Sequence, residues 1–555
     1  MIQMDLETRR INLDPLSFES ALEAIEKIVS ARYVKRSSAD LDNAGKATIP
    51  APKRPSAVIY PCSAEEVAEI VKIAKQYELP LWPCSKGRNW GYGSATPFLE
   101  NTAVLHLERL DRIIEINEEL AYAVIEPGVT YRQLKDHLRR HHPKLWCDCT
   151  DGPPDGSVIG NALDRGLGVT HYADHFGTLC GLEVVLPNGN TVWTGGGPKN
   201  CKTRHTHKWG VGPYLEGIFS QSNYGVVTKA GIWLMPKPEC FCSFQFDLAD
   251  EKDLPQLVDA VRALMLEGML QSASHIVNDV VALAVLSQYP APLLDQYSRL
   301  PDKLRLQMRD QYLVRPWSFG GGIQGSMASV RVVKRELRKR LSRLGKIMFM
   351  DDRLVTVVDT VRRIARTSLG AKPVNWILRR FMGKSLEMLE AAPHIHSVLQ
   401  GTPSDFFVRH AYFKSRLPKP DFAQPDRDNC GLIWFAPIAP MTSHYVQEIL
   451  DICQPLFKKY DFDFYAALLT QNSRSMIVLM SIFFLKEDPQ QERKASLLYE
   501  ELSEATAKAG YQPYRTSVTG MGKLAEMAPE FNALAKCLKD ALDPNHLLAP
   551  GKYGI

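Results

Sequence analysis

The amino-acid sequence predicts an α+β fold in which both ends of the chain form one domain and the middle forms another. Residues 57–82 have the pattern of a strand, a capped helix and a second strand, and they lead directly into a glycine-rich loop. Farther along, the pattern changes to long helical segments. The C-terminal residues 510–518 and 543–555 again have a pattern like that of the first domain. We therefore predict one domain from residues 1–240 plus 500–555 and an inserted domain from residues 241–499.

The first half of the chain alternates between strands and capped helices. Phe18, Leu22 and Val29 fall on one face of a helix over 17–33, and Ser63 with Glu66 is a capping-box signature ahead of the next helix. Strands are expected at 57–60, 79–82, 103–107, 112–116, 122–126, 182–186, 191–194 and 225–235, and a helix capped by Thr130 is expected to run to residue 142. Asn188-Gly189 is a strong hairpin turn signal between two of these strands.

The second half is expected to be mainly helical until two apolar strands return. Val333, Leu337, Leu341 and Leu344 fall at helical spacing, with basic residues filling the remaining positions. A solvated helix face explains such a basic surface better than a docking patch does. The apolar runs at 431–438 and 475–485 are expected to be strands.

The composition is that of a globular protein without a nucleic-acid or membrane signature. The 555 residues are 45% hydrophobic and 23% charged, which is ordinary. A formal charge of +5 is small for this length and argues against general nucleic-acid binding. The longest apolar run, Met476–Leu485, is too short to span a bilayer. With no secretory signal after Met1 and 11 cysteines that lack C-x-x-C spacing, we expect reduced thiols and a cytoplasmic location.

The loop PCSKGRNWGYGSATP, residues 83–97, is the first candidate for a binding site. Its glycines allow positive φ angles and close approach of a ligand, and successive backbone N–H groups in such a turn can form an anion-binding nest. The spacing matches neither a Walker loop nor a Rossmann fingerprint. From these residues alone, a phosphate cradle and a tight structural turn are about equally supported.

Two further polar regions follow. Residues 151–168, DGPPDGSVIGNALDRGLG, form a second glycine-rich stretch. His205 and His207 share a loop, but two histidines without further ligands are more typical of a surface loop than of a metal site, so no metal is expected.

Eight segments together resemble the vanillyl-alcohol oxidase / p-cresol methylhydroxylase family of FAD enzymes, and they cover nearly the whole chain in the family's order. They are GRNWGYGSATP (87–97), IEPGVTYRQL (125–134), GSVIGNALDRGLG (156–168), YADHFGTLCGLEVVLPNG (172–189), GPYLEGIFSQSNYGVVTKAGIWLMPKP (212–238), IWFAPIAP (433–440), YR (514–515) and DPNHLLAPGKYGI (543–555). The resemblance implies a two-part FAD-binding domain with an inserted α+β cap domain.

The resemblance also implies which residues bind FAD. The backbone of the first loop would hold the diphosphate, at Ser85, Lys86, Gly87, Arg88 and Asn89. Ser157, Gly160 and Asn161 of the second loop would continue the diphosphate and flavin contacts, and Lys552 would lie near the flavin N1–C2=O edge. A cation at that edge would stabilise reduced flavin.

Relatives in this family oxidise para-substituted phenols. A bound phenolate drives hydride transfer from the benzylic carbon to flavin N5, which leaves a quinone methide for water addition or desaturation. The implied anion clamp is Tyr92, Tyr514 and Arg515, whose positive charge would favour the phenolate. A Tyr-Arg pair on a strand would point to opposite faces, so joint action requires a local distortion.

Asp151 matches the acidic residue that the oxidase branch keeps near flavin N5, where it assists the redox step and can act as base. An Asp-Gly turn is the competing interpretation of this position. Asp148 is close enough in sequence to compete for the role, but Asp151 is favoured.

The sequence departs from the family where many relatives tether FAD covalently. Leu432 stands at the histidine position and cannot form such a bond; the tyrosine position falls near Gln424. Tyr412, His410 and Cys430 are nearby, but none aligns, so we expect non-covalent FAD. Ala467, Met476 and Met480 replace acidic and histidine residues of some relatives in the strand region 464–480, which predicts a more apolar pocket.

These inferences predict an FAD-dependent oxidoreductase that acts on a small phenolic molecule. The expected electron acceptor is O2 or a cytochrome-type protein, and the expected assembly is a homodimer or a higher homo-oligomer. Two alternatives stay open: FAD-linked oxidation of a hydroxy acid or sugar, and a flavin-binding scaffold that has lost catalysis.

Overall fold

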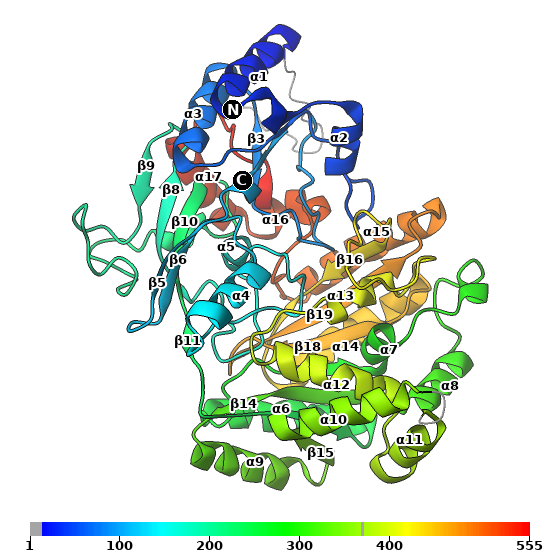
Figure 1. The fold of residues 1–555 in the computed structure, drawn as a ribbon. Helices are drawn as coiled ribbons and strands as arrows, with labels where there is room; N and C mark the ends of the chain where they lie inside the picture. Colours follow the sequence, from blue (N-terminus) through cyan, green and yellow to red (C-terminus); the bar gives the residue numbers. More distant parts are fainter. Residues whose placement is uncertain (1–13, 368–370) are drawn as a thin grey trace.

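The computed structural model describes residues 14–367 and 371–555, and its elements are drawn in Figure 1. Segments from the two ends of the chain lie together in the upper part of the view, and the middle of the chain forms the lower part. We name these parts the terminal body (residues 14–239 and 511–555) and the middle body (residues 240–510 of the described chain).

A four-stranded sheet begins the terminal body. Its order is β1-β2-β4-β3, and the β2–β4 and β4–β3 pairs are parallel. The predicted strand–helix–strand unit is confirmed, because Ser63 caps α3 by accepting from the N–H of Glu66 at 3.2 Å. The strands are β1 (Val34–Lys35), β2 (Val58–Ile59), β3 (Leu81–Cys84) and β4 (Ala103–His106), and α1 (Pro15–Val29), α2 (Ser38–Ala44) and α3 (Ala64–Gln76) accompany them.

A five-stranded antiparallel sheet follows in the same body. Its order is β5-β6-β10-β8-β9. The strands are β5 (Ile113–Asn117), β6 (Tyr122–Ile125), β8 (Leu179–Val185), β9 (Thr191–Trp193) and β10 (Val226–Trp233); the short pair β7 (Leu145–Trp146) and β11 (Met235–Pro236) lies beside it. Thr130 caps α4 (Tyr131–His141) as predicted, and α5 (Val158–Leu163) lies within the second glycine region.

The C-terminal residues return to the first sheet. The N–H of Leu81 donates to Leu547 and the N–H of Ala549 donates to Leu81, at 2.8 and 2.7 Å. The fully buried ammonium of Lys539, on α17 (Pro529–Leu542), donates to the carbonyls of Asn223 and Leu548 and to Asp543. One side chain therefore joins the tail to the loop that precedes β10.

The middle body is built on an eight-stranded sheet of order β15-β12-β14-β13-β18-β19-β16, with β17 also paired to β19. The sequence patterns predicted its apolar β16 and β19 and a strand region at 464–480 that contains β18. The expectation of a mainly helical middle was wrong for the remaining strands. Two of the missed strands are short or glycine-rich, as in the FGGG run of β14, and such strands carry a weak local signal. The strands are β12 (Cys240–Leu248), β13 (His275–Asn278), β14 (Trp317–Gly325), β15 (Gly345–Met350), β16 (Gly431–Phe435), β17 (Ile438–Pro440), β18 (Tyr465–Thr470) and β19 (Ser475–Phe484).

Helices cover this sheet and extend beyond it (Figure 1). They are α6 (Leu254–Leu266), α7 (Asp279–Leu286), α8 (Asp302–Tyr312), α9 (Met327–Leu341), α10 (Asp352–Ala365), α11 (Ala371–Ile377), α12 (Leu386–Val398), α13 (Asp405–Val408), α14 (Ser443–Lys459) and α15 (Pro489–Lys508); α16 (Leu524–Met527) belongs to the terminal body. Of the predicted apolar positions, Leu337 and Leu341 are buried in α9, and Val333 and Leu344 are half-buried against the same core. Most of the basic residues face solvent, as the pattern predicted.

The expected boundary at residue 500 falls inside α15. That helix is continuous to Lys508, and its Leu498 and Leu502 are fully buried in the core of the middle body. We propose that the division between the two bodies lies after α15 rather than within it.

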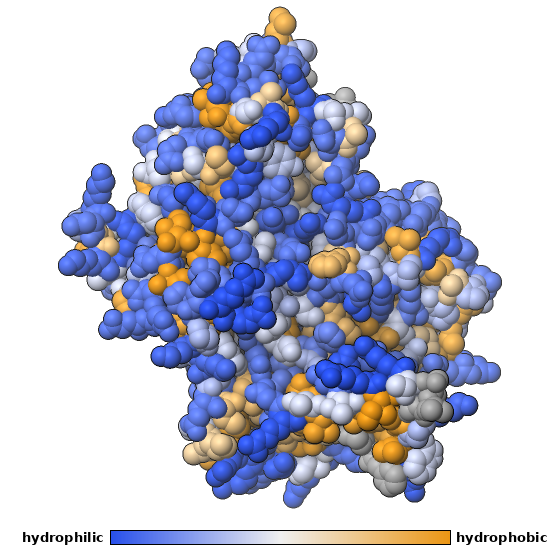
Figure 2. Space-filling model, in the orientation of Figure 1, coloured by the Kyte–Doolittle hydropathy of each residue, from blue (hydrophilic) through white to orange (hydrophobic). Residues whose placement is uncertain are grey.

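The face drawn in Figure 2 is mostly hydrophilic, with separate apolar clusters rather than one broad patch. The larger apolar groups lie in the interior, around the sheets of the two bodies. Among the described residues, no helix combines the length and apolar character that a bilayer crossing requires.

Replacing Lys539 by Met is expected to destabilise the terminal body by about 3–5 kcal/mol, because it leaves Asp543 buried without its cation. Urea denaturation of the wild type and the variant measures the difference. Lys536→Met, at an exposed site on the same helix, is the matched control. Equal stability of the two variants would contradict a structural role for the buried lysine.

Candidate functional site

A long groove runs through the terminal body between the two glycine-rich regions and the C-terminal tail. Its walls come from residues 82–94, 150–164, 219–227 and 515–521, with Lys552 and Tyr553 at the tail. All nine predicted cofactor residues, Ser85, Lys86, Gly87, Arg88, Asn89, Ser157, Gly160, Asn161 and Lys552, line this groove. The structure thus brings together residues that are separated by several hundred positions.

The first glycine loop is held in place from two sides. Gly91 has φ +77°, and a Cβ there would come within 2.4 Å of the Trp434 ring of β16. The N–H of Trp434 donates to the carbonyl of Gly91 at 3.1 Å, and the N–H of Val518 donates to the carbonyl of Tyr92 at 2.8 Å. The glycine is therefore required both by its backbone angle and by the close approach of the middle body.

The second glycine region organises a buried polar network around His175. The Nδ1 atom of His175 lies 2.6 Å from Asn161 Oδ1 and 3.0 Å from the Tyr131 hydroxyl, and its Nε2 lies 3.3 Å from Asp148. The side-chain oxygen of Asn161 is thus engaged with His175, and the side chain packs against Gly166. Gly168 is needed in this network, since a Cβ there would lie 2.0 Å from Asp148.

A smaller cavity of about 90 Å³ adjoins the groove, where the two bodies meet. The terminal body contributes Tyr92, Asp151 and Arg515, and the middle body contributes His410 and Trp434. Arg88, Asn89 and Asn161 line both spaces, so the cavity borders the groove.

Arg515 is the buried cation of this cavity. Its Nε donates to the carbonyl of Asp164 at 2.7 Å and its Nη2 to the carbonyl of Asn161 at 3.4 Å. Within the described chain it has no carboxylate partner in ion-pair contact. Burial favours the neutral form, but the negative charges of Tyr514, when ionised, and Asp164 together raise the pKa of Arg515. Its positive charge is therefore retained and lacks a direct counterion.

Tyr92 and Tyr514 are placed differently. Tyr92 is buried on the cavity wall, 5.7 Å from the guanidinium carbon of Arg515, and burial raises the pKa of its hydroxyl while Arg515 opposes the shift. The Tyr514 ring also lies beside that guanidinium, at 5.2 Å, but its hydroxyl donates to the carbonyl of Arg165 and it does not line the cavity. Residues 513–517 do not form a regular strand, so the side chains of Tyr514 and Arg515 are not forced to opposite faces and can lie beside each other.

The structure separates the two candidate acids. Asp151 lines the cavity, whereas Asp148 is buried, accepts hydrogen bonds from the N–H groups of Cys149, Val169 and Thr170, and contacts His175. Asp148 therefore has a structural set of partners, and Asp151 is the carboxylate that a ligand could meet.

Several groove residues were not identified from the sequence. The Asp164 carboxylate accepts from Asn89 Nδ2 at 3.2 Å and from the Tyr553 hydroxyl at 3.3 Å. Only the three-dimensional fold brings these groups together, although Tyr553 belongs to a motif that was recognised. Lys552 lies over the Trp82 ring, with 5.7 Å from its ammonium nitrogen to the ring centroid, and it lines the groove but not the smaller cavity.

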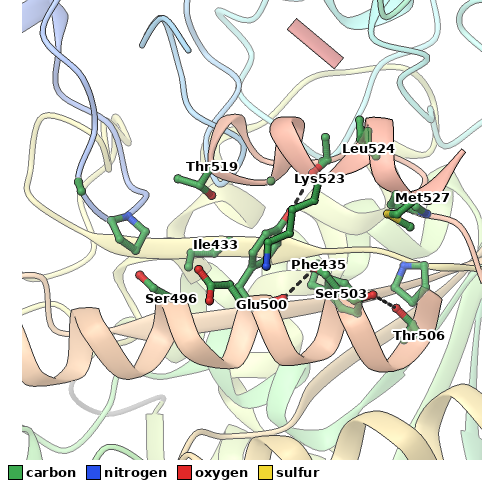
Figure 3. A pocket seen from close by; sticks show the side chains of 17 residues that line it. Ile433, Phe435, Ser496, Glu500, Ser503, Thr506, Thr519, Lys523, Leu524 and Met527 are labelled. Atoms are coloured by element: carbon green, nitrogen blue, oxygen red, sulfur yellow. Dashed lines mark hydrogen bonds between the residues drawn. The ribbon is translucent and has the colours of Figure 1, made fainter. Parts of the chain in front are cut away.

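A separate cavity of about 180 Å³ lies on the other side of β16 (Figure 3). Ile433 and Phe435 face it, while their neighbours Leu432 and Trp434 face the site. None of the predicted site residues lines this cavity, so it is not part of the candidate site.

Comparisons with known proteins agree with this geometry. The FAD binding domain family matches residues 55–195, and the C-terminal domain family of FAD linked oxidases matches residues 453–553. The 1'-carboxy-chondrochloren decarboxylase of Chondromyces crocatus is 34% identical over 98% of both chains. The 4-cresol dehydrogenase (hydroxylating) flavoprotein subunit of Pseudomonas putida is 28% identical over 90% of this chain and 88% of its own.

Two solved structures share the fold along nearly their whole length. The 4-ethylphenol oxidase of Gulosibacter chungangensis, in its isoeugenol complex, has a TM-score of 0.86, 28% identity and 99% coverage of both chains. Substrate-bound p-cresol methylhydroxylase has a TM-score of 0.84, 26% identity and 98% coverage of both chains. The chain belongs to the vanillyl-alcohol oxidase / p-cresol methylhydroxylase family. It is an FAD-dependent oxidoreductase with the two-part α+β fold that the sequence predicted.

The groove fits the FAD of this family. The backbone N–H groups of Gly87, Arg88 and Asn89 have no partner within the described chain, and they can therefore donate to a diphosphate. The two loops touch, since a Cβ on Gly160 would lie 2.2 Å from Ser85 Oγ. Ser157 Oγ already donates to Pro127 and accepts from the N–H of Gly160, so this hydroxyl shapes the loop. We propose that these loops hold the diphosphate, as expected from the resemblance.

The residues at the tether positions are consistent with non-covalent FAD, which stays a proposal. Leu432 is buried and lines the cavity, and Gln424 is exposed. Tyr412 donates to Asp428 and accepts from the N–H of Gln424, so its oxygen is engaged elsewhere. Of the nearby side chains, only the imidazole of His410 lines the cavity within the described chain.

The apolar middle-body residues that line the cavity are Val408, Ala411, Leu432 and Trp434, and they do not include Met476 or Met480. Strand pairing places Leu432 opposite Phe483 and Ala467 opposite Leu479, on the face that carries Trp434. Met476 and Met480 point to the opposite face, into the core of the middle body. That part of the expectation was wrong, because a residue's face depends on the pairing register.

The loop that contains His205 and His207 was considered as a metal site. His205 Nδ1 lies 2.9 Å from the carbonyl of Cys180, and the described residues contain no group of three or more potential metal ligands.

Acid precipitation of the purified holoprotein is expected to release FAD into the supernatant, because Leu432 offers no nucleophile at the position of the tether. The absorbance of the supernatant and of the redissolved pellet at flavin wavelengths measures the distribution. Flavin that stays with the pellet would contradict the proposal, and loss of that flavin in His410→Ala would identify His410 as the tether.

Proposed function

We propose that this oxidoreductase acts on a para-substituted phenol, such as a 4-alkylphenol or a lignin-type 4-hydroxyaryl compound. The reaction would remove a hydride from the benzylic carbon and pass through a quinone methide, which then gains water or loses a proton to form an alkene. The buried, unneutralised charge of Arg515 beside Tyr92 is the observation that carries this proposal.

An anion in this cavity would be stabilised more than it would be in water. Arg515 is held by backbone carbonyls rather than by a carboxylate, so its charge remains available to a ligand. An opposite charge close to a phenol lowers the phenol pKa by roughly 1–3 units. The ionised ring pushes electron density toward its para substituent, and this makes hydride loss from the benzylic carbon easier.

The remaining residues would orient the ring. Tyr92 offers a hydroxyl next to Arg515, and Trp434 packs edge-on to the Tyr92 ring at 5.8 Å. Asp151, on the same cavity, would assist the redox step. Bound FAD would supply the hydride acceptor. Tyr514 would bind the phenolate only if its hydroxyl broke its hydrogen bond to the carbonyl of Arg165. We therefore propose that Tyr514 contributes less to phenolate binding than Tyr92 and Arg515 do.

The relatives support a phenolic substrate. The names of 4-cresol dehydrogenase and 4-ethylphenol oxidase specify alkylphenols, and both proteins match nearly the whole chain. D-lactate dehydrogenase and glycolate oxidase relatives match less than half of it, which gives the hydroxy-acid alternative weaker support.

The test is an anaerobic titration of the holoprotein with 4-ethylphenol and a panel of lignin-type phenols, with lactate and glycolate as the comparison. Bleaching of the oxidised-flavin band by phenols alone is the expected result. Bleaching by the hydroxy acids instead would support the alternative, and no bleaching by either group would point to the scaffold without catalysis.

A second candidate reaction follows from the 34% identical decarboxylase. If the substrate carries a carboxylate on the carbon next to the benzylic carbon, the quinone methide can lose CO2. The electrons of the broken C–C bond then form the alkene, and the ring returns to the phenolate. This step needs neither water nor a base, so the same clamp would serve it.

3-(4-Hydroxyphenyl)propanoate distinguishes the two reactions. Decarboxylation predicts one CO2 and one 4-vinylphenol for each flavin reduced, as measured by gas analysis and chromatography. Bleaching by 4-ethylphenol without CO2 release from the propanoate would exclude the decarboxylation and leave the oxidation of alkylphenols.

Replacing Arg515 by Met is expected to remove the preference for the ionised phenol. Binding of 4-nitrophenol, whose phenolate is coloured, reports the ionised fraction directly. The wild type should lower the apparent pKa of the bound phenol by roughly 1–3 units relative to Arg515→Met. Arg165→Met, at an exposed side chain in the adjacent loop, is the matched control. An equal pKa in all three proteins would contradict the clamp.

A further inference from the structure

His410 is a titratable side chain of the middle body that no part of the proposed clamp uses. It lies directly after α13, on the wall of the cavity that Asp151 and Arg515 also line. Its ring is surrounded by aromatic side chains, with centroid distances of 6.1 Å to Trp434, 5.9 Å to Tyr465 and 5.9 Å to Phe483. The imidazole is therefore placed in largely aromatic surroundings on the wall of the cavity.

The hydrogen bond made by Nδ1 of His410 determines which of the two ring nitrogens carries the hydrogen. Nδ1 lies 2.6 Å from the carbonyl oxygen of Phe407, which can only accept, so Nδ1 carries the hydrogen. Burial lowers the pKa of His410, although the Phe407 carbonyl and the charge of Asp151 act against this shift. The neutral ring therefore presents Nε2 as a bare acceptor.

This acceptor has no partner. Nε2 is buried and makes no hydrogen bond within the described chain, and neither does the Nε1 donor of Trp434 on the same wall. Leaving a buried polar atom unpaired costs about 1–3 kcal/mol, so a ligand or water that supplies an O–H group would relieve that cost. An acceptor and a donor on one wall are the two partners that a water molecule needs.

We propose that His410 is the general base for the water that adds to the quinone methide. The water oxygen bonds to the benzylic carbon, one of its O–H bonds breaks, and that proton passes to His410 Nε2. The electrons of the quinone methide return to the ring oxygen, which becomes phenolate again beside Arg515. No oxidant is consumed in this step, and the assignment rests on the proposed phenol oxidation.

Asp151 is the competing base, because it lines the same cavity and the family resemblance gives it this role. The two assignments differ in position. Asp151 belongs to the terminal body with the groove, whereas His410 faces the cavity from the middle body, beside the apolar wall of Leu432 and Trp434. Substitution of each residue therefore separates the two.

The experiment measures the products formed from 4-ethylphenol by the holoenzyme. Water addition yields 1-(4-hydroxyphenyl)ethanol, and loss of a proton yields 4-vinylphenol. His410→Asn is the informative variant, since its amide can still donate to Phe407 but lacks the base at Nε2. A general base typically contributes about 10²–10⁴-fold. We expect the alcohol-to-alkene ratio to fall at least about 10-fold in His410→Asn.

The controls distinguish the possible failures. His394→Gln changes a histidine on α12 that does not line the cavity, and it should keep the wild-type ratio. An unchanged ratio in His410→Asn, or a shift toward the alcohol, would overturn the proposal, as would a fall seen only in Asp151→Asn. Failure of 4-ethylphenol to bleach the wild-type flavin would instead reject the underlying function. Flavin content of each variant shows whether the protein still assembles.

Discussion

The contact between Gly91 and Trp434 joins the two bodies, and the shape of the site depends on it. The hydrogen bond from the Trp434 N–H to the Gly91 carbonyl fixes β16 against the loop that lines the groove. The indole occupies the space where any Cβ at position 91 would lie. Because Tyr92 follows directly, the same contact sets the distance between the clamp of the terminal body and the wall of the middle body. We propose that this one loop couples cofactor binding to the substrate cavity.

The electrostatics of the cavity follow from the absence of a carboxylate in direct contact with Arg515 among the described residues. A carboxylate in direct contact would neutralise the guanidinium, whereas backbone carbonyls hold its position and leave most of its charge uncompensated. In apolar surroundings a charge acts more strongly than it does in water. Asp164 is near enough to raise the pKa of Arg515 but also interacts with Asn89 and Tyr553. We propose that this buried cation meets an anionic group of the ligand.

The sequence predicted local features well and contacts between distant segments poorly. The capped helix at Ser63 and the glycine loops depend on neighbouring residues, so their patterns could be read directly. Strand β14 has three adjacent glycines and gave no strand signal. The faces of Met476 and Met480 depend on register with β18, and the hydroxyl of Tyr514 depends on a carbonyl some 350 positions away, at Arg165. Neither the faces of the two methionines nor the partner of the Tyr514 hydroxyl can be obtained from local periodicity.

In the proposed reaction, the fate of the quinone methide would depend on whether water fits beside the substrate side chain. Among the middle-body residues that line the cavity, His410 is the one titratable group, and its neighbours Leu432 and Trp434 are largely apolar. In that proposal, a short alkyl group would leave more of the cavity to water next to Nε2, which would favour the alcohol. A longer or carboxylated side chain would occupy more of this cavity of about 90 Å³ and would exclude water. Alkene formation or CO2 loss would then be the available route. Hydroxylation and decarboxylation would thus use the same clamp and differ in what occupies the space at His410.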